Sequence, residues 1–143
     1  MKAFVESIGK VGSRARMGEH DMVFDQPLGV PGGENRGASP LDVMVVSVAA
    51  CAHYFASAFL YARGHTTDAL TVEVESEKQR LPVPRIGRLT LRVRLPPGLS
   101  EREIAGVERA IKGCPAYGTL LHPPTVEISV VAPPVGADER RTA

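Results

Sequence analysis

The sequence predicts an α+β domain in which short antiparallel strands flank one long apolar helix. Strand-like segments with apolar residues at alternate positions occur on both sides of an uninterrupted apolar segment of helix length. An amphipathic segment with helical spacing follows later in the chain. Strands and helices therefore come in separate runs instead of alternating regularly, and this order is typical of α+β proteins.

The length and composition are those of one folded domain. The chain has 143 residues, of which 43% are hydrophobic and 23% charged. We expect the domain to span residues 1–132 and residues 133–143 to form a flexible polar tail. The net charge of +1 provides no field that would attract nucleic acid or an anionic membrane, and we expect neither as a partner.

The first 38 residues are predicted to form short strands and then a loop. Strand-like pieces lie at Lys2–Ile8, Gly12–Met17 and Asp21–Asp25, separated by glycine and charged residues. The segment Gln26–Ala38 contains two prolines and four glycines, a composition that favours a loop. The N-terminus lacks the apolar run of a secretion signal, so we expect a cytoplasmic protein with reduced thiols.

A long helix is predicted to begin at Ser39. Serine is a good N-cap, Pro40 suits the first helical position, and Asp42 completes a capping pattern. The helix is predicted to end near Ala62, because Arg63-Gly64 is a C-terminal signature. Its residues are apolar on nearly every face, so we expect the helix to lie at the centre of the structure.

The second half of the chain is predicted to contain two strands, a helix and a last strand. Thr71–Glu75 and Arg88–Leu95 alternate apolar and polar residues, as strands with one wet face do. A helix begins after Ser100, where Glu103 completes a capping box. Thr125–Val131 alternates again and is predicted to be a strand.

Two cysteines are the first candidates for chemistry. Cys51 lies in the middle of the long helix, and Cys114 continues the apolar stripe of the second helix, Ile104, Val107 and Ile111. Both side chains are therefore expected to point into the same core, where they would form a redox-active pair. Two inert core cysteines fit the same pattern, because free cysteine is often buried as a small hydrophobe.

A nucleophilic Cys51 would need a neighbouring cation. Burial in the middle of a helix raises the pKa of a thiol, and a positive charge is the usual remedy. The candidates are Arg36, in the glycine-rich loop before the helix, and Arg14 or Arg16 on the early strands. We expect no metal site, since the four histidines do not share ligand spacing with the cysteines; His53, for example, is two residues from Cys51 and on another face.

The residues around both cysteines resemble a known family. The stretch from Gly37-Ala38-Ser39-Pro40-Leu41-Asp42 to Ala49-Ala50-Cys51 resembles the first signature of the OsmC/Ohr family, the osmotically inducible and organic hydroperoxide resistance proteins. Lys112-Gly113-Cys114-Pro115 resembles the second, a helix that ends in Cys-Pro. The resemblance covers about residues 1–132.

This resemblance implies a thiol-dependent peroxidase that acts on small organic hydroperoxides. Cys51 would become a sulfenic acid, Cys114 would resolve it as a disulfide, and an external dithiol would reduce that disulfide. The family also implies an intertwined homodimer around the central helices, an arginine and an acidic residue at each site, and no metal or organic cofactor.

The acidic position departs from the usual pattern. Typical hydroperoxide resistance proteins have the acid directly after the proline, whereas here Leu41 follows Pro40 and the acid is Asp42. This resembles a Ser-Pro-x-acidic branch of the family. Nine helical residues separate Asp42 from Cys51 and turn it by about 900°, to the opposite side of the helix. Asp42 is therefore either a member of the site or only a helix cap.

Two other functions fit the same sequence. A non-catalytic thiol redox sensor would use the same cysteine pair without turnover. A hydrophobic ligand-binding protein would use the apolar helix and its small residues Ala49, Ala50 and Ala52 to line a pocket.

Overall fold

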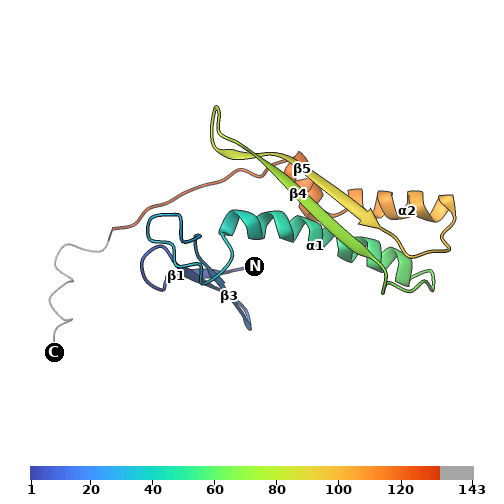
Figure 1. Cartoon of the computed structure of the whole chain (residues 1–143), viewed down its shortest axis with the longest axis horizontal. Helices are drawn as coiled ribbons and strands as arrows, with labels where there is room; N and C mark the ends of the chain where they lie inside the picture. The colour runs from blue at the N-terminus through green and yellow to red at the C-terminus, as the bar shows by residue number, and fades with distance from the viewer. Residues whose placement is uncertain (133–143) are drawn as a thin grey trace.

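A long central helix runs through the computed structural model, which describes residues 1–132 (Figure 1). A small sheet lies at the N-terminal end of this helix, a two-stranded ribbon crosses it, and two further helices pack along it (Figure 1). The elements are β1 (Phe4–Ser7), β2 (Ser13–Met17), β3 (His20–Phe24), α1 (Pro40–Tyr61), β4 (Thr71–Gln79), β5 (Arg85–Arg94), α2 (Glu101–Lys112) and α3 (Pro115–Leu121). The predicted α+β class is confirmed.

Both sheets are antiparallel. The first has the strand order β1-β2-β3 and the second pairs β4 with β5. Opposite charges face each other across the ribbon, since Glu73 pairs with Arg92 and Glu77 with Arg88 in the register. Such cross-strand pairs help to keep the register.

The capping signals in the sequence set the two ends of α1. The Ser39 hydroxyl accepts a hydrogen bond from the backbone N–H of Asp42 at 3.3 Å, as an N-cap does. At the other end, Gly64 adopts a φ of +78°, which glycine tolerates better than other residues. The core forms where the C-terminal half of α1 meets α2, around Ala56, Leu60, Leu70 and Val107.

Part of α1 stays uncovered. Val45, Val48 and Ala52 are buried, whereas Val46 is 59% and Tyr54 65% exposed. Of its most apolar 18-residue stretch, which has the length and composition of a membrane span, 33% is buried. Residues 1–132 of one chain therefore do not enclose the central helix.

In the C-terminal region one expectation was wrong and one helix was missed. Thr125–Val131 is not a strand; it makes no backbone pairing with another strand of residues 1–132, and Ile128 is 85% exposed. Alternation alone does not make a strand, which needs a neighbouring edge to receive its hydrogen bonds. The sequence reading also missed α3, because it took Pro115 as the end of a helix and not as the first residue of the next. The expected tail, residues 133–143, lies outside the described residues.

Candidate functional site

The structure brings together two thiols that are 63 positions apart in the sequence. Cys51 lies on α1 and is partly exposed, whereas Cys114 lies in the break between α2 and α3 and is 1% exposed. Both are free, and the side chains form a hydrogen bond that affects the pKa of Cys51. This contact makes them a candidate redox pair.

Local backbone chemistry places Cys114. Helix α2 ends at Lys112 with Gly113 as its cap, and Pro115 is the first residue of α3. The residue before a proline avoids helical backbone angles, and Cys114 accordingly has an extended conformation with φ −65° and ψ 130°. The chain therefore turns at Cys114, where two helices packed against α1 meet.

The pKa of the Cys51 thiol is raised. Burial is the largest cause and the hydrogen bond with Cys114 adds to it, while a hydrogen bond from the backbone N–H of Ala116 acts in the opposite direction. Burial disfavours the thiolate because it removes the charge from water. In the single chain Cys51 is therefore a protonated thiol at neutral pH, and a reactive thiolate needs a further positive group.

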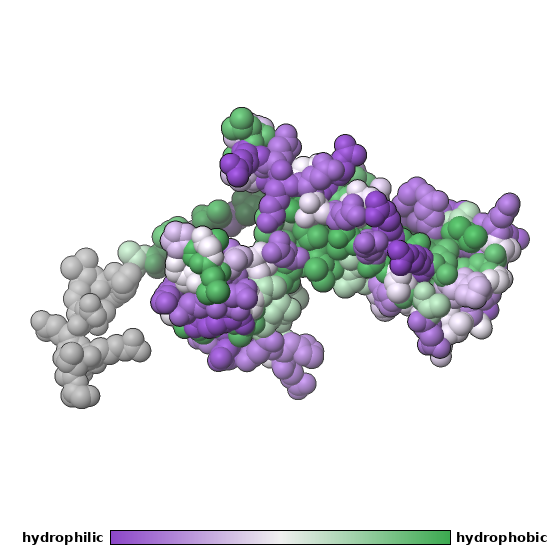
Figure 2. Space-filling model, in the orientation of Figure 1, coloured by the Kyte–Doolittle hydropathy of each residue, from purple (hydrophilic) through white to green (hydrophobic). Residues whose placement is uncertain are grey.

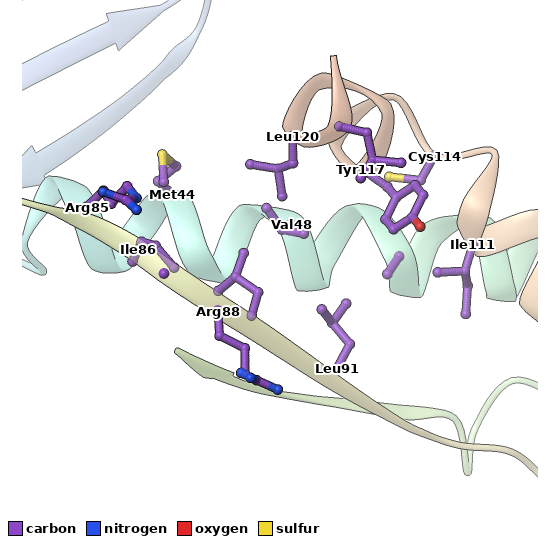
Figure 3. A pocket seen from close by; sticks show the side chains of 14 residues that line it. Met44, Val48, Arg85, Ile86, Arg88, Leu91, Ile111, Cys114, Tyr117 and Leu120 are labelled. Atoms are coloured by element: carbon purple, nitrogen blue, oxygen red, sulfur yellow. The ribbon is translucent and has the colours of Figure 1, made fainter. Parts of the chain in front are cut away.

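An apolar cavity of about 500 Å³ opens beside the thiols, between α1, β5 and α3 (Figure 3). Cys114 belongs to its wall, and Cys51 does not. Met44 and Arg85 lie at one end of the cavity, and Cys114 and Ile111 lie toward the other (Figure 3). The cavity is lined by Met44, Val48, Ala52, Arg85, Ile86, Gly87, Arg88, Leu89, Leu91, Ile111, Cys114, Tyr117, Leu120 and Leu121.

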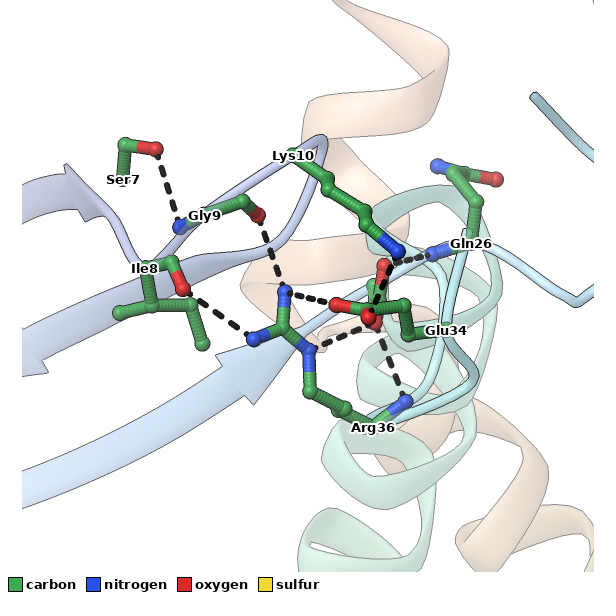
Figure 4. A network of polar contacts seen from close by, with 8 residues as sticks. Ser7, Ile8, Gly9, Lys10, Gln26, Glu34 and Arg36 are labelled. Carbon is green, nitrogen blue, oxygen red and sulfur yellow. Dashed lines mark hydrogen bonds and ion pairs between the residues drawn. The ribbon is translucent and has the colours of Figure 1, made fainter. Parts of the chain in front are cut away.

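The guanidinium of Arg36 is engaged by groups other than Cys51. Its Nε lies 3.1 Å from Oδ2 of the buried Asp25, and its two Nη atoms donate to the carbonyls of Ile8 at 3.1 Å and Gly9 at 2.9 Å (Figure 4). One Nη also pairs with Glu34 at 3.1 Å. Arg36 is absent from the groups that shift the pKa of Cys51. It instead ties the glycine-rich loop to the β1–β2 turn.

The other predicted residues also have contacts of their own. Arg16 pairs with Asp21 at 3.4 Å and with Glu6 at 3.7 Å. Arg14 lies on β2 opposite Val23 and is exposed. Neither arginine is among the groups that shift the pKa of Cys51.

Asp42 has the contacts of a helix cap. It accepts a hydrogen bond from the Ser39 hydroxyl at 2.6 Å, and its other oxygen lies 3.7 Å from Lys78 Nζ. Within residues 1–132, no three His, Cys, Asp or Glu side chains lie together as metal ligands would.

Sequence reasoning missed three features of the site. The first is the backbone N–H of Ala116, whose position depends on α3. The Cys114-Pro115 pair is the sequence signal for the start of that helix. Arg85 and Arg88 line the cavity although they are far from both cysteines in the sequence. No local signal marks them, because β5 reaches the cavity only through the tertiary fold.

Known structures share this fold. An OsmC-like protein from Mycoplasma pneumoniae matches with a TM-score of 0.72 and 21% identity, over 85% of this chain and 86% of that one. A Psychrobacter arcticus protein, whose description names osmotic stress and a detoxification response, matches with a TM-score of 0.73 and 16% identity, over 83% and 87%. An organic hydroperoxide resistance protein from Legionella pneumophila matches with a TM-score of 0.62 and 17% identity, over 83% and 87%.

The sequence itself assigns the family. No protein with a curated description matches the chain. The family model described as OsmC-like protein matches residues 32–129, a range that includes both cysteines and every residue that lines the cavity. Because the match covers more than half of the sequence, this chain belongs to the OsmC/Ohr family.

Proposed function

We propose that the protein is a thiol-dependent peroxidase that reduces organic hydroperoxides. The observation that carries this proposal is the contact between Cys51 and Cys114 beside an apolar cavity. An apolar cavity suits the organic part of such a substrate, and a thiol pair suits its reduction. A similar fold in an organic hydroperoxide resistance protein agrees with this role.

In the proposed cycle Cys51 is the nucleophile and Cys114 the resolving thiol. The Cys51 thiolate attacks the terminal peroxide oxygen, the O–O bond breaks, and the alkoxide leaves as an alcohol after taking a proton. The resulting sulfenic acid is attacked by the Cys114 thiolate, which forms the S–S bond and releases water after a proton is taken up. An external dithiol then reduces the disulfide by exchange, and both thiols are restored. The scheme requires no metal or organic cofactor.

A homodimer is part of the proposal, because no cation of residues 1–132 is among the groups that shift the pKa of Cys51. The pKa of Cys51 is raised in the chain by itself, and Arg36 is held by Asp25. We propose that Arg14 or Arg16 of a second copy supplies the positive charge. The exposed apolar residues of α1 and of residues 125–131 support such a pairing. The need for a dithiol reductant agrees with a cytoplasmic location.

Cysteine variants test the roles. Cys51→Ser should abolish consumption of an organic hydroperoxide in the presence of a dithiol, whereas Ser57→Ala on the same helix should retain the wild-type rate. Cys114→Ser should form no intramolecular disulfide and should accumulate over-oxidised Cys51, as mass spectrometry of a non-reduced digest would show. Turnover at the wild-type rate in both cysteine variants would refute the thiol-dependent mechanism. If Cys51→Ser lost turnover but peroxide still oxidised its Cys114, Cys114 would be the nucleophile and Cys51 the resolving thiol.

The apolar cavity also supports a second candidate, binding of a hydrophobic ligand without turnover. Its volume of about 500 Å³ is within the range of small-molecule sites. A thiol sensor would use the same cysteine pair. Steady-state consumption of hydroperoxide with a dithiol separates the enzyme from both, since neither a carrier nor a sensor turns over repeatedly.

A further inference from the structure

We propose that Met44 is a modification site, at which an organic hydroperoxide in the apolar cavity transfers one oxygen atom to the thioether sulfur. The inference rests on the proposed function only in taking an organic hydroperoxide as the molecule that enters the cavity. The product, methionine sulfoxide, would weaken further binding and so limit the use of the cavity when hydroperoxide is in excess over the reductant.

Met44 carries the most accessible sulfur of the cavity wall. The wall contains two sulfur atoms, those of Met44 and Cys114, which lie toward opposite ends (Figure 3). Cys114 is 1% exposed, whereas Met44 is 42% exposed. Cys51 does not line the cavity. A molecule that enters from water therefore meets the side chain of Met44 more readily than either thiol.

The chemistry of a thioether also favours reaction at Met44. A thiol attacks a peroxide as its thiolate, and burial raises the pKa of the Cys51 thiol. A thioether has no proton to lose, so its reactivity toward peroxides does not depend on a pKa. Oxidation of methionine to its sulfoxide is a common oxidative reaction in proteins. In the single chain Met44 is therefore a nucleophile that needs no activating charge.

The oxygen transfer needs no reagent besides the hydroperoxide. A lone pair of the Met44 sulfur attacks the terminal oxygen, the S–O bond forms and the O–O bond breaks. The proton of the terminal oxygen passes through water to the leaving alkoxide, which becomes an alcohol; the sulfur is oxidised and the peroxide reduced by the same electron pair. Arg85 lies at the same end of the cavity (Figure 3). Within residues 1–132 it donates only to two carbonyls, at 3.4 and 3.5 Å, so its other N–H groups can hydrogen-bond the departing oxygen.

Sulfoxide formation makes this part of the wall polar. Met44, Val48 and Ala52 all line the cavity, and because they are four residues apart they form one apolar row on α1. A sulfoxide oxygen accepts hydrogen bonds, and covering it with an apolar ligand leaves it without a partner, which costs free energy. We expect the modified protein to bind apolar molecules more weakly until a methionine sulfoxide reductase restores the thioether.

Peptide mass spectrometry tests the modification, and the chain contains its own control. Met22 is 37% exposed, close to the 42% of Met44, and it lies on β3 and does not line the cavity. Full-length Cys51→Ser, which should not consume the oxidant, is treated with cumene hydroperoxide or with hydrogen peroxide. The ratio of sulfoxide at Met44 to sulfoxide at Met22 should be about tenfold higher with cumene hydroperoxide, the factor that roughly 1.4 kcal/mol of binding gives.

An unreactive ligand provides a second test. Cumyl alcohol has the carbon skeleton of cumene hydroperoxide without the O–O bond, so it should protect Met44 and not Met22 from oxidation. Met44→Gln, which places a polar amide where the sulfoxide would lie, should bind cumyl alcohol more weakly in calorimetry, while Met22→Gln should bind it like the wild type. The same sulfoxide ratio with both oxidants, no protection, or equal affinity in the two Gln variants would overturn the inference.

Turnover by the wild type separates this inference from the proposed peroxidase. If the wild type consumes cumene hydroperoxide catalytically with a dithiol, but Met44 is not preferentially oxidised in Cys51→Ser, the peroxidase stands and this inference fails. If Met44 is oxidised selectively and the wild type does not turn over, the inference stands and the peroxidase fails.

Discussion

Asp25 is the only charged side chain that residues 1–132 bury, with 1% exposed. Burial by itself raises the pKa of this carboxyl. Hydrogen bonds from the backbone N–H groups of Gln26 and Arg36 and from the Arg36 guanidinium outweigh burial, and the pKa is lowered overall. Asp25 is therefore ionised at neutral pH, and its main partner is Arg36.

Replacement of Arg36 should affect stability and not thiol chemistry. Arg36→Met leaves a buried carboxylate without its cation, so we expect a lower free energy of unfolding in urea. Arg16→Met removes only exposed ion pairs and should have a smaller effect on stability. The pH dependence of Cys51 alkylation should be the same in Arg36→Met and the wild type; a raised thiol pKa in Arg36→Met would return this arginine to the site.

Glu103 is one specific cause of the loss of folding stability at acidic pH. Hydrogen bonds from the side chain and backbone of Ser100, followed by the one with His65, lower the pKa of Glu103 from 4.5 to about 2. A carboxyl with a depressed pKa in the folded state stabilises the fold above its unfolded pKa. This contribution is lost as the pH falls from 4.5 toward 2.

Glu103→Gln should therefore make the free energy of unfolding less dependent on pH in the acidic range. Denaturant unfolding between pH 5 and pH 2 would show a smaller loss of stability in the variant than in the wild type. Glu101→Gln, in the same first turn, is the control and should retain the wild-type slope. An unchanged slope in Glu103→Gln would show that the capping box does not hold the charge.

At the scale of elements, α2 approaches α1 closely at Gly106. A Cβ atom at this position would overlap the ring of Phe59. Gly118 in α3 is the opposite case, since nothing lies within 4 Å of the place where its Cβ would be. The two glycines are therefore a matched pair for testing the packing.

Gly106→Ala should destabilise the protein although alanine favours helices. Overpacking costs about 1–3 kcal/mol, against a gain of about 1 kcal/mol in helix propensity. Gly118→Ala has only the gain and should be neutral or stabilising. Urea unfolding of both variants measures the difference; a Gly106→Ala protein as stable as Gly118→Ala would contradict the close packing.

Local signals predicted most elements. Ser39, Pro40 and Gly64 define the ends of α1 through their own backbone chemistry, so these ends could be read from the sequence. The α3 helix and the unpaired residues 125–131 could not, because they depend on a helix restart at Pro115 and on the presence of a neighbouring strand. The thiol pair could be inferred from the apolar central helix and the apolar stripe of the second helix. The partners of Arg36 and the arginines of the cavity required the tertiary structure.

At the scale of the whole molecule, much apolar surface remains open. Figure 2 shows apolar residues gathered over the middle of the molecule, between more hydrophilic ends. Val46 of α1 and Val126, Ile128 and Val130 of the C-terminal segment are exposed. A monomer rarely exposes so many large apolar side chains, so we expect a second copy to cover them.

Light scattering should give twice the mass of one 15.3 kDa chain. Ile128→Lys should shift the equilibrium toward monomer if residues 125–131 pair with the second copy, because a charge would then be buried. Glu127→Lys changes the neighbouring residue on the other face of the extended segment and serves as the control. A 15.3 kDa species for the wild type at micromolar concentration would refute the dimer.

The contact between Cys51 and Cys114 has a further consequence for the fate of an oxidised thiol. In an unfolded chain, closing a loop of 63 residues costs conformational entropy. Folding has already brought the two thiols together, so each thiol is at a high effective concentration relative to the other. An intramolecular disulfide should therefore outcompete mixed disulfides with soluble monothiols, and only a dithiol that offers a second intramolecular step should reverse it efficiently.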